Sequence, residues 1–136
     1  MPNAVVMTGY GPPEVLKWAA VPVPEPGKGQ VRIKVKAAGI SPTDLALRAG
    51  YLKDIPLPAD AVLGFEAAGT VDAVGPDVTG TSIGDAVTAL LLSLGGYAEY
   101  AVASIWARKP ESVSWLDAAA LPSSAEAAAE IGRAHV

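Results

Sequence analysis

The stretch Leu63–Val78, which reads LGFEAAGTVDAVGPDV, places the strongest constraint on how this chain can fold. Val71 and Ala73 alternate with their neighbours in the period-two pattern of a β-strand. Three glycines interrupt the same apolar run: Gly64, Gly69 and Gly75. Glycine inside a strand marks a bend, a bulge or a close approach of backbone. The stretch therefore predicts a strand that packs tightly against neighbouring chain.

Glu66 is the unusual residue of this stretch, because its neighbours Phe65 and Ala67 are apolar. A carboxylate in such surroundings needs a hydrogen-bonding partner or a place at a functional surface. In the absence of a nearby metal-ligand pattern, we expect a buried structural hydrogen bond.

Composition narrows the fold and the function classes. Of 136 residues, 51% are hydrophobic and 18% charged, which is typical of one globular domain. The 14 glycines and 12 prolines favour short strands and turns, hence a barrel or sandwich. A net charge of −4 argues against nucleic-acid binding. With no cysteine, disulfides and thiolate metal sites are excluded. No apolar run reaches membrane-spanning length, so a cytoplasmic protein without a membrane partner is expected.

Two further segments have readable local structure. In Gln30–Ala38, Val31, Ile33, Val35 and Ala37 alternate with Arg32, Lys34 and Lys36. This pattern predicts a strand with the apolar face in the core and the other face in water. Ser41-Pro42-Thr43-Asp44 predicts a helix that begins with a capping box and ends at Gly50.

The C-terminal segment predicts helices. Ser114 and Asp117 have capping-box spacing, and Pro122 interrupts the helix that would follow. Ser123 is expected to cap another helix, which Gly132 would end.

Several motifs together carry a family resemblance. The pattern Gly64-Phe65-Glu66-x-x-Gly69-x-Val71-x-x-Val74-Gly75 resembles the signature of the medium-chain dehydrogenase/reductase superfamily, and more narrowly its zinc-independent quinone oxidoreductase and enoyl reductase branch. Zinc-dependent members have a metal-binding histidine where this chain has Phe65. The segments Gly84–Val87, Gly95–Tyr100 and Ala118–Pro122 also resemble family segments, in order.

The resemblance implies a mainly β fold, a GroES-like, partly open β-barrel with a few short helices, over residues 1–122. Residues 123–136 would form a short helical tail, as a truncation or an excision junction would leave. Family members carry a Rossmann domain after the barrel. The spacing of Gly64, Gly69 and Gly75 is too wide for its Gly-x-Gly-x-x-Gly turn, so that domain is expected to be absent from this chain.

The resemblance also implies site residues. Ser41 stands where zinc enzymes have a cysteine, and its hydroxyl is expected to act on a substrate carbonyl or the nicotinamide amide. Asp44 is a candidate cofactor contact, but the structural role is favoured because capping geometry already explains this residue. Tyr51 is a candidate catalytic and pocket residue, and Phe65 is expected to pack the substrate cleft. No metal ligand set is present, and the single histidine, His135, is not expected to act as a general acid.

The implied function is the substrate-side part of an NADPH-dependent, zinc-independent oxidoreductase that reduces quinones or the double bonds of enones and enoyl thioesters. The chain alone is expected to be inactive. The alternatives are a non-enzymatic binding or assembly module and a cofactor-free enzyme using Ser41, Tyr51 and Tyr97. Apolar residues at 90–94 and 118–129 predict self-association.

Overall fold

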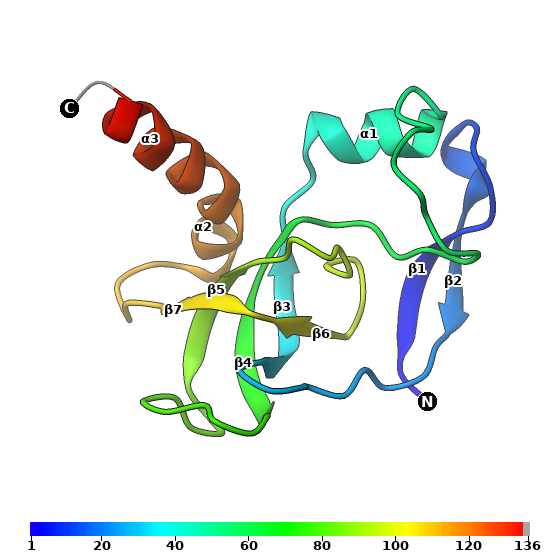
Figure 1. Ribbon diagram of the computed structural model, residues 1–136. Coiled ribbons are helices and arrows are strands. Elements are labelled where there is room, and N and C mark those ends of the chain that lie inside the picture. The colour runs from blue at the N-terminus through cyan, green and yellow to red at the C-terminus, as the bar shows by residue number, and fades with distance from the viewer. Residues whose placement is uncertain (135–136) are drawn as a thin grey trace.

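The computed structural model describes residues 1–134, in which strands outnumber helices (Figure 1). The strands are β1 (Asn3–Met7), β2 (Leu16–Ala20), β3 (Val31–Ala38), β4 (Glu66–Val74), β5 (Ala86–Leu90), β6 (Tyr100–Ala103) and β7 (Ile105–Arg108). The helices are the 3-10 turn η1 (Pro13–Val15), α1 (Pro42–Ala49), α2 (Trp115–Ala120) and α3 (Pro122–Ala134). The predicted mainly β architecture is confirmed.

Five strands form one curved sheet in the order β6-β3-β4-β5-β7, and all of its pairings are antiparallel. The outer strands β6 and β7 are consecutive in sequence, with only Ser104 between them. A one-residue connection between the two edges requires the sheet to curl back on itself, which gives a partly open barrel. Strands β1 and β2 form a separate antiparallel ribbon, which Figure 1 shows beside the barrel.

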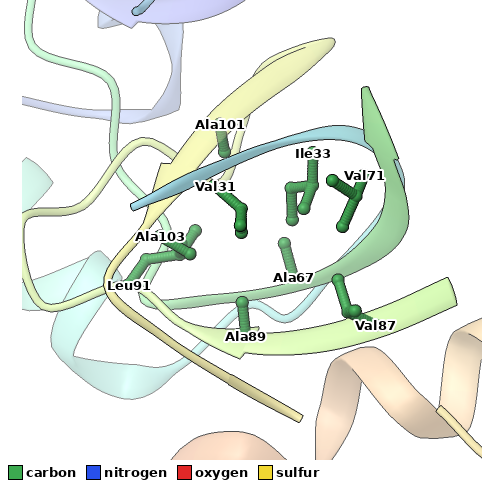
Figure 2. Packing of buried hydrophobic residues seen from close by; sticks show 9 residues of the cluster. All are labelled: Val31, Ile33, Ala67, Val71, Val87, Ala89, Leu91, Ala101 and Ala103. Carbon is green, nitrogen blue, oxygen red and sulfur yellow. The ribbon is translucent and has the colours of Figure 1, made fainter. Parts of the chain in front are cut away.

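The barrel is filled by small and branched apolar side chains that point inward from β3, β4, β5 and β6 and from the residue after β5 (Figure 2). The buried members are Val31, Ile33, Ala67, Val71, Val87, Ala89, Leu91, Ala101 and Ala103. Four of the nine are alanines, and such short side chains let opposite walls approach closely. The period-two pattern at Val31 and Ile33 is confirmed, since both are fully buried.

The glycines of β4 and its turn are positions of close backbone approach. A Cβ atom on Gly69 would overlap the carbonyl oxygen of Lys34 on the neighbouring strand β3. A Cβ atom on Gly75 would overlap the carbonyl oxygen of Gly27 in the β2–β3 connection. The expectation of tight packing around this stretch is therefore confirmed.

The alternation expected along β3 stops before the strand ends. The register with β4 shifts between Val35 and Ala37. Ala37 therefore packs with the alanines of α2 outside the barrel, and Ala38 packs against the barrel core. The expectation that Ala37 shares the core face with Val31 is wrong, because the irregularity changes the direction of the following side chains.

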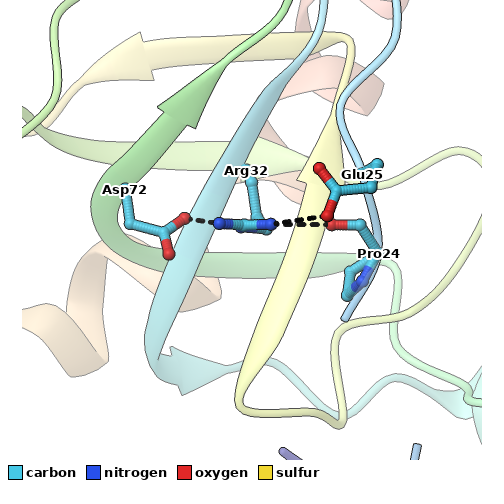
Figure 3. Close-up of polar contacts among 4 residues, drawn as sticks. All are labelled: Pro24, Glu25, Arg32 and Asp72. Atoms are coloured by element: carbon cyan, nitrogen blue, oxygen red, sulfur yellow. Dashed lines mark hydrogen bonds and ion pairs between the residues drawn. The ribbon is translucent and has the colours of Figure 1, made fainter. Parts of the chain in front are cut away.

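Arg32 is also not part of a freely solvated strand face. Its Nε donates to Asp72 on β4 at 2.9 Å, and its Nη1 donates to the carbonyl oxygen of Pro24 at 3.2 Å (Figure 3). Nη1 also lies 3.5 Å from the carboxylate of Glu25. The hydrogen bond that Arg32 donates to Asp72 raises the pKa of Arg32 above its usual value. Arg32 thus fastens the β2–β3 connection to the sheet, whereas Lys34 is exposed as expected.

The C-terminal helices follow the sequence pattern only in part. Ser114 caps α2 by accepting a hydrogen bond from the Asp117 amide at 3.1 Å, as predicted. Helix α3 begins at Pro122, so Ser123 lies inside the first turn and is not the cap. Gly132 lies within α3, which continues to Ala134, and the predicted stop at this glycine is wrong.

Candidate functional site

Ser41 and Asp44 lie at the N-terminal end of helix α1, which is part of the connection between β3 and β4. Ser41 is the N-cap, with Pro42 at the first helical position, and Ser41 and Asp44 form the predicted reciprocal capping box. The Asp44 amide donates to Ser41 Oγ, and the Ser41 amide donates to Asp44 Oδ2 at 3.0 Å. Gly50 ends α1 in the left-handed conformation at φ 90°, which a residue with a side chain adopts at a cost.

The Asp44 carboxylate is a buried junction of four hydrogen bonds. Its side chain is only 2% exposed. Oδ2 accepts from the Ser41 amide, from Ser41 Oγ at 3.1 Å and from the phenol of Tyr97 at 2.8 Å. Oδ1 accepts from the Gly64 amide at 3.1 Å. These bonds join α1 to the segments before β4 and before β6, which gives Asp44 a structural role; its contact with a cofactor stays a prediction.

The same network determines which hydrogen bonds Ser41 can make to a substrate. Its hydroxyl hydrogen is directed to Asp44 Oδ2, and its oxygen accepts from the Asp44 amide at 3.4 Å. To donate to a substrate carbonyl, the hydroxyl would have to release Asp44. In the described arrangement Ser41 presents an acceptor, and its predicted donor role requires rotation about the side-chain bond.

Tyr97 is the aromatic residue that the structure brings to this network. Partial burial raises the pKa of its phenol well above the usual value, and the hydrogen bond to Asp44 and the nearby carboxylate charges act in the same direction. The phenol therefore stays protonated and donates to Asp44. From sequence, Tyr97 was a candidate only for cofactor-free chemistry; the Gly-Gly-Tyr pattern was the signal, but it carries no information about the partner.

Glu66 joins three chain segments at the start of β4. Its side chain is 7% exposed, and Oε2 accepts a hydrogen bond of 2.8 Å from the Ser123 amide in the first turn of α3. A Cβ atom on Gly39 would overlap the Glu66 carboxylate, so the two residues are in direct contact. The Gly39 amide also donates to the Glu66 carbonyl oxygen at 3.1 Å. A carboxylate at a helix N-terminus is favourable because the helix dipole is positive there. The expected buried structural hydrogen bond of Glu66 is confirmed.

Exposed apolar residues lie next to each of the segments that Glu66 contacts. Ile40, 75% exposed, follows Gly39, and Leu121, 52% exposed, lies two residues before Ser123. Leu92, 68% exposed, follows Leu90, the residue that pairs with Glu66 across β4 and β5. Apolar side chains left in water beside these segments suggest a surface that another group covers.

Phe65 and Tyr51 differ in how far they are buried. Phe65 is half-buried and packs against a small apolar cluster that contains Leu47 and Leu63. Tyr51 follows the last turn of α1 and is 82% exposed. Ser41 and Tyr51 lie at opposite ends of this eight-residue helix, about 12 Å apart along its axis. The structure therefore does not bring these two predicted catalytic residues to one substrate atom.

Two further observations concern the described residues. Among residues 1–134, no group of three or more His, Cys, Asp or Glu side chains is placed to hold a metal ion. In the same part of the chain, no helix has the length and apolar character needed to cross a membrane. His135 lies outside the described residues.

Residues 27–109 match the family described as alcohol dehydrogenase GroES-like domain. The chain belongs to this family. It is the GroES-like domain of the medium-chain dehydrogenase/reductase superfamily, as the sequence motifs predicted. The match contains strand β3, helix α1 and the whole Glu66 stretch, whereas Leu121 and Ser123 lie C-terminal to it.

Two curated relatives illustrate the breadth of the superfamily. The chain is 36% identical over 122 residues to the mouse synaptic vesicle membrane protein VAT-1 homolog-like, covering 88% of this chain and 29% of the relative. It is 34% identical over 130 residues to the enoyl reductase component of lovastatin nonaketide synthase from Aspergillus terreus, covering 89% and 34%. The chain thus spans about a third of the length of these relatives.

Solved structures give the same result. The quinone oxidoreductase from Coxiella burnetii superposes with a TM-score of 0.82 at 35% identity, over 95% of this chain and 43% of that one. A mycobacterial protein solved in complex with NADPH superposes with a TM-score of 0.78 at 36% identity, over 88% and 38%. The predicted GroES-like fold is therefore confirmed.

Proposed function

We propose that this domain forms the substrate-side wall of a zinc-independent, nicotinamide-dependent reductase that acts on quinones or on the double bonds of enones and enoyl thioesters. The proposal is carried by the side-chain contacts at the position where zinc-dependent relatives bind metal. There Phe65 packs into an apolar cluster and Glu66 is committed to the Ser123 amide. Relatives named as quinone oxidoreductase and enoyl reductase support the reaction class.

The described residues do not by themselves fit a dinucleotide. Binding of a pyrophosphate in this superfamily's manner needs a parallel β-α-β unit with a Gly-rich turn. The sheet pairings among residues 1–134 are antiparallel, and the backbone between β3 and α1 is shaped by a capping box. We therefore assign NADPH binding to protein outside these residues.

This chain would shape one side of the substrate cleft and exclude water from it. Ile40, Leu92 and Leu121 provide apolar surface for a flat, neutral substrate. The Glu66 carboxylate contacts Gly39 and accepts from the Ser123 amide, which fixes the segments that carry Ile40 and Leu121 relative to each other. Exclusion of water at such a surface would protect a hydride transfer and strengthen any hydrogen bond to the substrate carbonyl.

Calorimetric titration of NADPH into the purified chain, together with a quinone-reduction assay on the same sample, tests the assignment of the nucleotide to other protein. We expect neither binding nor turnover. Saturable binding with turnover would contradict the proposal, because the chain would then assemble its own cofactor site.

A binding or assembly module is the second candidate. It is favoured by the internal use of Ser41 and Asp44, which are bonded to each other and not directed outward. Self-association through the exposed apolar residues Leu92 and Leu121 also stays a proposal. Sedimentation that shows a monomer at high concentration would contradict it.

A further inference from the structure

A pocket of about 430 Å³ lies away from the predicted site residues. It is bounded by the β2–β3 connection, the loop after β5, and strands β6 and β7. The lining residues include Pro24, Leu91, Leu92, Ser93, Ala101 and Ile105. Ser41, Tyr51 and Phe65 are not among them. Its volume lies within the usual range for small-molecule sites.

The pocket wall carries no ionisable group apart from the phenol of Tyr100. Not one Asp, Glu, Lys, Arg or His contributes to it, although 18% of the chain is charged. Four residues bring polar side-chain atoms: Gln30, Ser93, Tyr100 and Ser104. Gln30 Nε2 donates to Ser104 Oγ at 3.1 Å, so these two side chains are already bonded to each other. Within the described part of the chain, no hydrogen bond involves the Ser93 hydroxyl, which leaves it available to a ligand.

Contacts outside the pocket hold its walls in place. Arg32 on β3 holds the β2–β3 connection by donating to the carbonyl oxygen of Pro24. Within the connection, Gln30 Oε1 accepts from the Gly27 amide at 2.8 Å. The loop after β5 is held by the Gly95 amide, which donates to the Val62 carbonyl oxygen at 3.1 Å. A pocket whose walls are fixed in advance loses little conformational entropy when a ligand enters.

The floor and rim are apolar, and the loop that forms one wall is strained. Leu91 and Ala101 of the barrel core form the floor, and the exposed side chains of Leu92 and Ile105 lie at the rim. Leu94 has φ 69°, a conformation that is unfavourable for a residue with a branched side chain. Backbone strain of this kind persists where the surrounding structure enforces it, often at ligand sites.

We propose that this pocket binds a neutral, mainly apolar small molecule that carries a carbonyl group. The apolar part of the ligand would lie on Leu91 and Ala101 and cover Leu92 and Ile105. The Ser93 hydroxyl would donate a hydrogen bond to the carbonyl oxygen. A similar ligand with a carboxylate in place of the carbonyl group would bind more weakly, because the pocket wall offers no cation to compensate for desolvation of the charge. The pocket shares Leu92 with the apolar surface of the proposed substrate cleft, but its binding of a ligand does not require the reductase reaction.

Titration of the ¹⁵N-labelled chain with 2-acetylnaphthalene, followed by NMR, tests the proposal, with 2-naphthoate as a probe of similar ring shape but negative charge. We expect saturable shifts at the Ser93, Leu94 and Ala101 amides, without comparable shifts at Ser41 or Tyr51. The naphthoate should bind at least about tenfold more weakly. No saturable shift, shifts centred elsewhere, or equal binding of the two probes would overturn the proposal.

A matched pair of variants locates the site independently. Ser93→Phe places a ring at the mouth of the pocket and removes the donor, whereas Thr79→Phe makes a similar change at an exposed position outside the lining. Both residues are exposed, so both variants should fold. We expect Ser93→Phe to weaken 2-acetylnaphthalene binding about tenfold or more and Thr79→Phe to leave it unchanged. Equal affinities for the two variants would overturn the proposal.

Discussion

Glu66 Oε2 accepts a 2.8 Å hydrogen bond from the Ser123 amide, although 57 residues separate the two in sequence. This bond fastens the N-terminus of α3 to the first residue of β4. The same carboxylate lies against Gly39, so one buried side chain sets the relative positions of three segments. The candidate site is arranged around this contact.

Replacement of Glu66 tests that arrangement. Glu66→Ala leaves the Ser123 amide without an acceptor and should lower the free energy of unfolding by about 1–3 kcal/mol in urea denaturation. Glu66→Gln keeps one acceptor oxygen and should cost less. Amide hydrogen exchange at Ser123 should accelerate in the alanine variant. The control, Glu111→Ala, removes an exposed carboxylate and should change neither quantity. Unchanged exchange at Ser123 in Glu66→Ala would contradict the clamp.

Asp44 should be the most sensitive polar position of the domain. Asp44→Asn keeps one acceptor oxygen but replaces Oδ2, which accepts from three donors, by an amide group that cannot accept. We expect a loss of about 3 kcal/mol or more in the free energy of unfolding. Tyr97→Phe removes one of the four donors and should cost about 1 kcal/mol. A loss for Asp44→Asn no larger than for Tyr97→Phe would contradict the junction role.

Alkaline pH should weaken the fold through Tyr97. The pKa of this phenol is raised in the folded state above the ordinary value of 10.0. Above pH 10 the unfolded chain therefore loses a proton that the native state retains, so stability falls as pH rises through this range. The contribution is fully present below pH 10. Urea denaturation at a series of alkaline pH values should show a steeper decline for the wild type than for Tyr97→Phe. Identical declines would show that Tyr97 titrates normally in the fold.

Gly69 tests the close approach between β3 and β4. In Gly69→Ala the new methyl group would overlap the Lys34 carbonyl oxygen, which belongs to backbone and cannot move independently. We expect a loss of about 3 kcal/mol or more, measured as the free energy of unfolding. Gly9→Ala is the matched control, because no atom lies within 4 Å of a Cβ atom there. Equal stabilities of the two variants would contradict this packing.

Patterns within short segments predicted most of the local structure. The capping box of Ser41 and Asp44, the helix end at Gly50 and the buried residues of β3 follow from rules that act over a few residues. The glycine spacing predicted close backbone approach but not the partner, since Gly69 meets Lys34 from another strand. The irregularity at Ala37 and the true start of α3 at Pro122 depend on packing that a local pattern does not contain.

The candidate site was less predictable for the same reason. Sequence reasoning identified Glu66 as buried, but its partner Ser123 is distant in the chain. The family resemblance made Tyr51 a candidate pocket residue together with Ser41, yet the two lie at opposite ends of an eight-residue helix. Tyr97 is distant in sequence from Asp44 and reaches it only because the segment before β6 folds back beside α1.

The most direct test of the central claim is a chimaera in which this chain replaces the corresponding part of the Coxiella burnetii quinone oxidoreductase, whose structure superposes on 95% of it. Oxidation of NADPH with 1,4-naphthoquinone is measured with and without a metal chelator, and NADPH binding is measured on the same sample. The account predicts quinone reduction that the chelator does not change. A folded chimaera that binds NADPH but reduces neither quinones nor enones, or that loses activity with the chelator, would contradict it.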